Sequence, residues 1–331
     1  MDIFSVLLMG KPLWMWCGFS GVVGTLLAFD LGLFHRTGRD IGVRESLAMS
    51  AVYIAIALLF AVAVWATLGA AKAGDFLTGY IVEKTLSIDN VFIISLIFST
   101  LAIPPRYQHR VLFWGIFGAI ALRGTMIAAG ATLVAEFHWI LYVFAGFLIV
   151  TGLKMLQADD KPLDLATHPA IAFVRRVVAW TPVLHGEKFI VRQSNPASGR
   201  LQWVATPLLL ALILIEFADL IFAVDSIPAI FAITTDPFIV TTSNIFAILG
   251  LRALYFGLAA FIDRFKYLKQ ALALVLIFIG AKVFVPPILG WDKFPAAVSL
   301  GVTVALIASG IAYSVYRTRN GVAQQTIGAP R

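Results

Sequence analysis

Five carboxyl groups lie in two stretches of the sequence that are otherwise mostly apolar, "EKTLSIDNVF" (residues 83–92) and "IEFADLIFAVDSIPAIFAI" (residues 215–233). They are Glu83, Asp89, Glu216, Asp219 and Asp225. An acid at the centre of a membrane helix costs about 2.5–3.5 kcal/mol, so these acids need a compensating partner. Together with the amide of Asn90 and the hydroxyl of Ser226, they offer the oxygen ligands that hard divalent cations such as Mn²⁺, Ca²⁺ and Mg²⁺ prefer. We therefore predict a metal site made from these seven side chains.

The acids could also be compensated without a bound ion, in either of two ways. Five cations fall within apolar stretches, and the three central ones, Arg123, Arg252 and Lys84, could neutralise some of the acids as buried ion pairs, whereas Lys154 and Lys282 lie nearer helix ends. The carboxyl groups could instead be protonated, as buried acids tend to be. A carboxyl that changes its protonation state can also carry a proton, so protonated acids are compatible with transport. Asp30, in "FDLGLFHR", is either an interfacial acid or part of a cytoplasmic mouth.

A straight helix cannot direct all three acids of the second stretch at one ion. With 3.6 residues per turn, Glu216 and Asp219 lie about 60° apart, whereas Asp225 lies about 180° from Glu216. Pro228 has no N–H to donate to the carbonyl of Val224. We therefore predict that the chain breaks around "AVDSIP" and turns backbone oxygens toward a cavity, where broken membrane helices are tolerated.

The composition requires these residues to be positioned by membrane helices. Of the 331 residues, 60% are hydrophobic and 13% are charged, and the mean hydropathy is +0.91, outside the range of soluble globular domains. The fold class is therefore all-α, a polytopic transmembrane bundle of about nine helices in one domain over residues 1–331. The expected helices span residues 13–34, 46–70, 76–101, 111–134, 139–156, 207–232, 241–262, 268–289 and 295–316.

The basic residues predict how the chain is inserted. Most of the 25 Lys and Arg residues fall in loops after the odd-numbered helices or near the C-terminus, whereas the opposite loops contain Lys11, Lys72 and Lys293. Under the positive-inside rule the N-terminus is outside and the C-terminus is cytoplasmic. The net charge of +7 thus reports topology rather than a nucleic-acid partner. The bilayer is the first expected partner, and the oligomeric state stays open.

One long loop, residues 157–206, divides the chain. Its segment "HPAIAFVRRVVAW" (residues 168–180) is typical of a short helix lying on the cytoplasmic membrane face. The following "KFIVRQSNPASGRLQWVA" predicts two short strands around a turn. The loop is either a plain connection or a regulatory element.

The segments on either side of this loop, residues 76–156 and 207–289, resemble each other. The alignment pairs Glu83 with Asp219, Asp89 with Asp225, Asn90 with Ser226, Arg123 with Arg252, and Lys154 with Lys282. Each unit has three helices, an odd number, so the second unit is inverted relative to the first. Inverted repeats of this kind support alternating access in many secondary transporters.

Several function classes have no signal in the sequence. No Walker loop, dinucleotide-binding glycine motif, nucleophile elbow or H-E-x-x-H pattern is present, so we expect no enzyme activity and no cofactor. Cys17 is the single cysteine, which excludes an internal disulfide and a thiolate metal cluster. Energy for transport would then come from an ion or proton gradient.

Four motifs resemble the TerC family of integral membrane proteins, particularly its Alx-type members. They are "TGYIVEKTLSIDNVFIISLIF", "IPPRYQHRVLFWGIFGAIALRG", "FAVDSIPAIFAITTDPFIVTTSNIFAILGLRALYF" and "DRFKYLK". The resemblance implies a manganese exporter of the inner membrane whose functional acids are the five named above.

The expected function is accordingly a secondary transporter that exports divalent cations, Mn²⁺ in particular, in exchange for protons. Arg123 and Arg252 would limit the negative charge of the empty site. Two alternatives remain at this stage. One changes the cargo to Ca²⁺ or a small organic cation, and the other is a non-transporting subunit of a membrane stress complex whose acids hold partner helices.

Overall fold

The computed structural model is a helical bundle, and it describes residues 6–35, 43–157, 179–194, 201–258, 268–291 and 294–327. Its helices are α1 (Leu13–His35), α2 (Val43–Leu68), α3 (Ala70–Thr100), α4 (Pro105–Glu136), α5 (Ile140–Gln157), α7 (Pro207–Ile233), α8 (Pro237–Leu249), α9 (Leu251–Leu258), α10 (Leu268–Leu289) and α11 (Ala296–Ile327). Within these residues, seven helical segments are long and apolar enough to cross a membrane. The predicted all-α polytopic class is confirmed.

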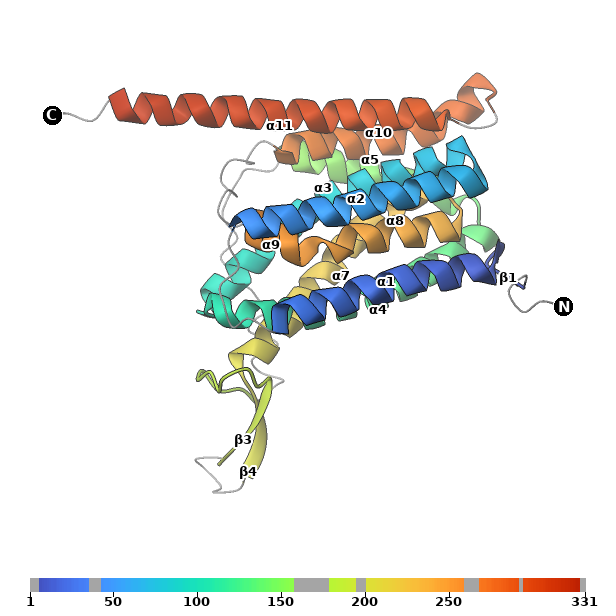
Figure 1. Cartoon of the computed structure of the whole chain (residues 1–331). Helices are drawn as coiled ribbons and strands as arrows, with labels where there is room; N and C mark the ends of the chain where they lie inside the picture. The colour runs from blue at the N-terminus through green and yellow to red at the C-terminus, as the bar shows by residue number, and fades with distance from the viewer. Residues whose placement is uncertain are drawn as a thin grey trace.

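Two antiparallel hairpins lie at opposite ends of the bundle (Figure 1). One pairs β1 (Leu7–Leu8) with β2 (Lys11–Pro12) just before α1. The other pairs β3 (Ile190–Ser194) with β4 (Leu201–Ala205) just before α7, as predicted from the sequence. The surface helix predicted for residues 168–180 falls almost wholly outside the described residues.

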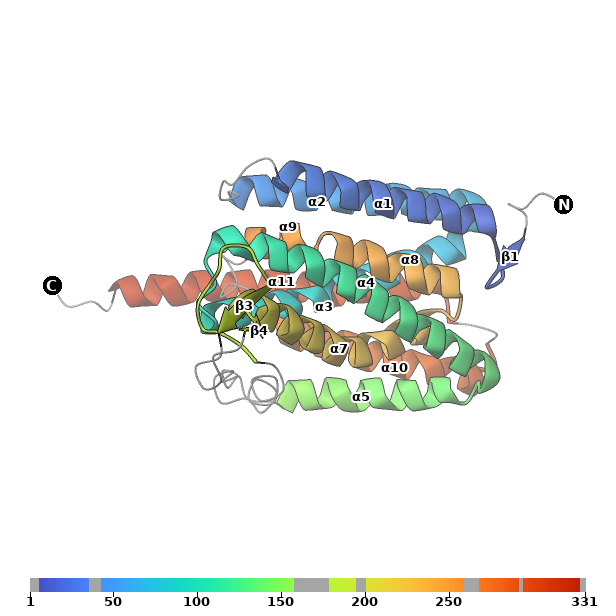
Figure 2. The same cartoon turned by 90° about the horizontal axis from the view of Figure 1, so that it is seen from below.

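The helices lie side by side with their axes along roughly one direction (Figures 1 and 2). α3 has a central position, because it contacts α2, α7, α8 and α11. α5 lies along α10, and the two form the most extensive helix pair of the bundle. On the α1–α2 side, Phe60, Phe76, Phe238 and Phe246 form a cluster of ring contacts that holds α8 against α2 and α3.

The segment predicted as one helix over residues 241–262 is two helices. α8 begins earlier, at Pro237, because Asp236 caps it by accepting hydrogen bonds from the N–H groups of Phe238 and Ile239. It ends at Leu249, and Gly250 separates it from α9. The carbonyl of Ala247 in the last turn of α8 accepts a hydrogen bond of 3.1 Å from Lys84 Nζ, which satisfies one of the orphan oxygens of that helix end.

The break predicted around "AVDSIP" is wrong. α7 is a single helix from Pro207 to Ile233 with Pro228 inside it. A proline removes one backbone hydrogen bond, but a membrane helix can tolerate this where neighbouring helices surround it. The turns around Pro228 are held in this way, since Ile227, Ala229 and Phe231 are all buried. The run of helical hydrogen bonds is interrupted instead between α8 and α9.

Candidate functional site

Arg123, in the middle of α4, links two acids from different helices. Its side chain is 1% exposed. Nη1 donates to Glu83 Oε1 of α3, while Nη2 and Nε donate to the two oxygens of Asp219 of α7 at 2.8 and 3.1 Å. This is the two-pronged geometry by which a guanidinium binds a carboxylate most strongly. Arg123 thereby neutralises one of the two charges.

Amide and hydroxyl groups from three helices complete this arrangement. Asn90 Nδ2 of α3 donates to Asp219 Oδ1 at 3.3 Å, and Arg123 Nη1 is 3.2 Å from Asn244 Oδ1 of α8 and 3.5 Å from Ser226 Oγ of α7. The set, called the Arg123 cluster below, consists of Glu83, Asn90, Arg123, Asp219, Ser226 and Asn244. All six are buried. Two amide atoms in the cluster, Asn90 Oδ1 and Asn244 Nδ2, have no hydrogen-bond partner among the described residues.

Asn244 is a member of the cluster that the sequence reasoning missed. It is 0% exposed, and eleven of the 13 residues of α8 are buried. The signal that could have identified it is an amide side chain inside the apolar segment "TTSNIFAILGLRA", where an unpaired polar group is costly.

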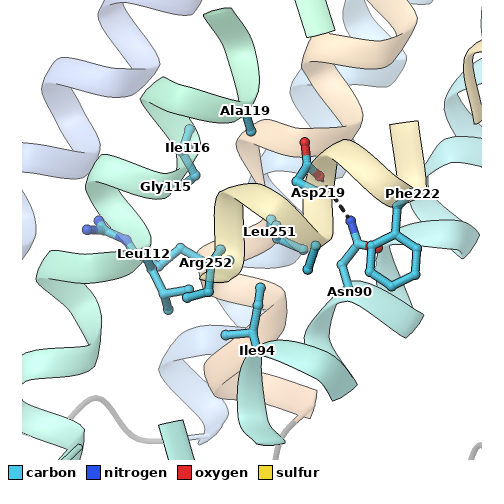
Figure 3. Close-up of a pocket in the computed structure, with 12 residues that line it drawn as sticks. Asn90, Ile94, Leu112, Gly115, Ile116, Ala119, Asp219, Phe222, Leu251 and Arg252 are labelled. Carbon is cyan, nitrogen blue, oxygen red and sulfur yellow. Dashed lines mark hydrogen bonds between the residues drawn. The ribbon is translucent and has the colours of Figure 1, made fainter. Parts of the chain in front are cut away.

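A small pocket lies beside the cluster. Asn90, Asp219 and Arg252 supply its polar wall, and side chains such as Ile94, Leu112 and Ile116 supply its apolar wall (Figure 3). In Figure 3, Asn90 of α3 and Asp219 of α7 point toward each other on one side of the pocket and are joined by their hydrogen bond. The cavity has a volume of about 20 Å³, which is enough for one water-sized body. A cation entering it must first lose most of its hydration shell.

Glu216 has a different position from the other acids. Its carboxylate lies against Gly118 of α4, and a methyl group on Gly118 would overlap the carboxylate. Gly115, one turn away, leaves ordinary contact room. Oε1 of Glu216 is buried and has no hydrogen-bond partner among the described residues. Glu216 therefore lies in a glycine-lined recess next to the pocket, and no hydrogen bond of the Arg123 cluster includes it.

The structure brings together four of the seven predicted ligands, Glu83, Asn90, Asp219 and Ser226. The side chains of Asp89, Asp225 and Asp30 lie outside the described part of the chain. Among the side chains that are described, no three of His, Cys, Asp and Glu are placed to hold a metal ion. In this conformation Glu83 and Asp219 form buried ion pairs, the first of the two metal-free arrangements considered above, with Arg123 as their partner.

The other predicted counter-ions have separate positions. Lys84 donates to the Ala247 carbonyl at the end of α8. Arg252, in the first turn of α9, is buried and lines the pocket. Lys282 of α10, the predicted repeat partner of Lys154, is buried and donates to Ser299 of α11 at 2.8 Å, whereas Lys154 is exposed.

Comparison with known proteins identifies the family. Residues 68–321 match the integral membrane protein TerC family. The chain belongs to the TerC family. It is 46% identical over 306 residues to the uncharacterized membrane protein STKORF319 of Myxococcus xanthus, covering 92% of this chain and 93% of that protein. It is also 45% identical over 302 residues to an uncharacterized membrane protein of Rickettsia felis, covering 91% and 97%.

Another TerC-family relative carries a functional name. The Alx protein of Escherichia coli (strain K12), named as a candidate membrane-bound redox modulator, is 46% identical over 307 residues, covering 90% of this chain and 92% of Alx. The match to a multi-pass membrane family and the apolar helices agree that the chain is an integral membrane protein. No solved structure is significantly similar to it.

Proposed function

We propose that this TerC-family protein is a secondary transporter that exports divalent cations, Mn²⁺ in particular, across the inner membrane in exchange for protons. The observation that carries the proposal is the Arg123 cluster, where two acids, two amides and a hydroxyl from α3, α7 and α8 surround a single buried guanidinium. Ionisable groups at membrane depth often mark ion pathways, and the two acids here outnumber the one guanidinium that pairs with them. The cargo and the coupling to protons are the expectations drawn from oxygen-ligand chemistry and from the family resemblance.

The charge of Arg123 shows how the proposed exchange of a metal ion for protons could be balanced. Two acids beside one guanidinium leave one negative charge, and Asp89 and Asp225, on the same two helices, add two more when ionised. A divalent cation that binds Glu83 and Asp219 must displace Arg123, because the two cations compete for the same oxygens. When the ion leaves, Arg123 returns, or protons neutralise the acids. Two protons balance one divalent ion, so a two-for-one exchange leaves the charge of the site unchanged.

The contact between α5 and α10 supports the inverted repeat that alternating access requires. A methyl on Gly152 would be 2.6 Å from Ile277 Cγ1 and 2.7 Å from the Ala273 carbonyl. A methyl on Gly280 would be 2.9 Å from Ile149 Cγ1 and 2.6 Å from the Ala145 carbonyl. The alignment that pairs Lys154 with Lys282 also pairs Gly152 with Gly280, Ile149 with Ile277, and Ala145 with Ala273. Each helix therefore presents the same residue types to the other, as expected if a two-fold axis lies between them.

The size of the pocket favours an inorganic ion over a small organic cation. A volume of about 20 Å³ holds one water-sized body. Ca²⁺ remains a rival cargo because it accepts the same oxygen ligands. The redox role in the name of Alx belongs to that protein, and the single cysteine of this chain, Cys17, cannot form an internal disulfide.

Reconstituted transport tests the proposal. Purified protein in liposomes is expected to move ⁵⁴Mn²⁺ faster with a pH gradient than without one. Glu83→Gln, Asp89→Asn, Asp219→Asn and Asp225→Asn should each abolish this flux, whereas Glu136→Gln, at the exposed end of α4, should leave it unchanged. Unchanged flux in Asp89→Asn and Asp225→Asn would sink the assignment.

Two further measurements separate the rivals. Excess Ca²⁺ should slow ⁵⁴Mn²⁺ flux only weakly if Mn²⁺ is the cargo, and strongly if Ca²⁺ is. Isothermal titration of wild-type protein should detect Mn²⁺ binding at micromolar to millimolar concentrations, and a complete lack of binding to any divalent ion would favour the non-transporting subunit.

The proposed orientation places the N-terminus outside and the C-terminus in the cytoplasm. In a Cys17→Ser background, a Lys11→Cys variant should react with a membrane-impermeant maleimide in intact cells. A Gln193→Cys variant, in β3, should react only after the cells are permeabilised. The reverse pattern would contradict the positive-inside assignment.

A further inference from the structure

The β3–β4 hairpin lies beside the bundle rather than beyond it. In Figure 1 its strands run across the direction of the helix axes, level with the helix ends, and project sideways past α4 and α7. Figure 2, seen along the direction of this projection, places the same hairpin in front of α4 and α7. For a bundle that crosses a membrane, this is the depth of the lipid headgroups.

The base of the hairpin is attached firmly to the helices. Thr206, just before α7, donates through its hydroxyl to the Lys188 carbonyl at 2.7 Å and through its N–H to the Phe189 carbonyl at 2.9 Å. Arg110 of α4 forms an ion pair of 2.7 Å with Glu187 and lies 5.4 Å from the centre of the Phe189 ring. The hairpin is therefore held at a defined position relative to the bundle.

The two faces of the hairpin have an unusual distribution of polarity. The register pairs Arg192 with Trp203 and Ser194 with Leu201, so these side chains and Ile190 share one face. This face, called the Trp203 face below, is open, because Leu201 is 72%, Trp203 62% and Ile190 50% exposed. The opposite face contains Val191 and Val204, which are buried.

The Trp203 face combines apolar side chains with a cation. The Arg192 guanidinium lies 4.4 Å from the centre of the Trp203 ring. The stack leaves the N–H groups at the guanidinium edge free of the ring, where they can donate to a phosphate. Arg106 and Arg110 lie at the same end of the bundle, in the first turns of α4, and the nearby carboxylate of Glu187 is already paired.

We propose that the Trp203 face binds the anionic phospholipid headgroups of the leaflet at the cation-rich end of the bundle. Trp is enriched at the headgroup level because its ring is apolar and its N–H is polar. Leu201 and Ile190 extend from the same face and enter the upper acyl region, and Arg192 binds the phosphate. The hairpin is thus a lipid-binding arm, and its binding does not depend on the transported cargo.

Spin labels on the two faces of full-length protein test the proposal. In a Cys17→Ser background, Leu201→Cys labels the Trp203 face and Gln193→Cys, one strand position from Arg192, labels the opposite face. The protein is placed in nanodiscs of phosphatidylcholine alone or mixed with phosphatidylglycerol. With phosphatidylglycerol, the ratio of collisions with oxygen, which dissolves in lipid, to collisions with a soluble nickel chelate should be several-fold higher at position 201 than at 193.

A charge variant then tests the role of phosphate recognition. Arg192→Gln should reduce the difference between the two lipid mixtures at position 201, while Lys188→Gln, outside the strands, should reduce it less. A label at position 201 that stays open to the nickel chelate in both mixtures overturns the proposal. So does a label shielded from both reagents in both mixtures, because that result indicates a protein partner or a second copy of the chain.

Discussion

Arg123 holds together two buried carboxylates and is the cation with which both form ion pairs. It is 40 residues from Glu83 and 96 residues from Asp219 in the chain, so the contact depends on three separate helices. Removing one member of a buried ion pair usually costs more than the pair contributes, because the remaining charge stays desolvated. The stability of the bundle and its affinity for cations should therefore both depend on this one side chain.

Replacing Arg123 should destabilise the protein and make it respond to metal. Arg123→Met is expected to lower the free energy of unfolding by about 3–5 kcal/mol, measured by thermal unfolding in detergent. Mn²⁺ should then raise the melting temperature of Arg123→Met more than that of wild type, since the competing cation is gone. Arg106→Gln, at an exposed position, is the control. An Arg123→Met protein that melts like wild type and ignores Mn²⁺ contradicts this view of the cluster.

The Glu216 carboxylate occupies the space beside Gly118 where a side chain would lie. Gly118→Ala should displace this flexible carboxylate and destabilise the protein by about 1 kcal/mol, the low end of the cost of overpacking. Gly124→Ala, on the same helix, has open space around the added methyl and should be neutral or stabilising by up to about 1 kcal/mol. The double variant Gly118→Ala with Glu216→Ala should recover most of the loss. If it does not, the overlap with Glu216 is not the cause.

The start of α8 depends on Asp236, which connects three elements. Its side chain caps α8 and forms ion pairs with Lys11 of β2 at 3.0 Å and with Lys72 of α3 at 3.1 Å. Burial alone would raise the pKa of this carboxyl, but the hydrogen bonds and charges of the two lysines outweigh burial and hold its pKa below the usual value of 3.8. The folded state therefore favours the ionised acid.

This pKa predicts a stability difference that is lost in acid. Because the folded pKa is below the unfolded one, the contribution of Asp236 is present above the unfolded pKa and disappears as the pH falls through the folded pKa. Asp236→Asn keeps a capping side chain but loses the ion pairs, and should cost about 1.5–3 kcal/mol at neutral pH. The difference in melting temperature between wild type and Asp236→Asn should stay the same from pH 7 to about 5. It should then shrink and disappear as the pH falls below 3.8. A difference that grows in acid refutes the assignment.

At the scale of the whole molecule, the α5–α10 contact joins residues 76–156 to residues 207–289, the two segments predicted to be repeats. Gly152→Ala and Gly280→Ala should each destabilise the protein by about 1–3 kcal/mol and by similar amounts, because the added methyls meet equivalent residues. Each should also slow ⁵⁴Mn²⁺ flux if the halves move against each other. Gly146→Ala, with open space on α5, is the matched control. Strongly unequal effects of the two variants would argue against a two-fold relation.

The polytopic helical class, the approximate helix positions and the β3–β4 hairpin could all be predicted from the sequence. Hydropathy along the chain and the turn residues between two short strands are local properties, and membrane insertion and hairpin formation depend mainly on them. The same local reasoning identified the polar residues at membrane depth, because any charge in such a segment is conspicuous. The family resemblance was visible in the same motifs and is confirmed.

Only the tertiary structure decided which of these polar groups meet. The break predicted at Pro228 was wrong, because burial of α7 among its neighbours keeps the helix continuous, whereas Gly250 divides α8 from α9. Arg123 contacts Glu83 and Asp219, while Lys84 turns to a backbone carbonyl and Glu216 to a glycine recess. These contacts depend on how each helix is rotated and which helix lies next to it. Rotation and neighbours are settled by packing across the whole bundle, and no local stretch of sequence contains them.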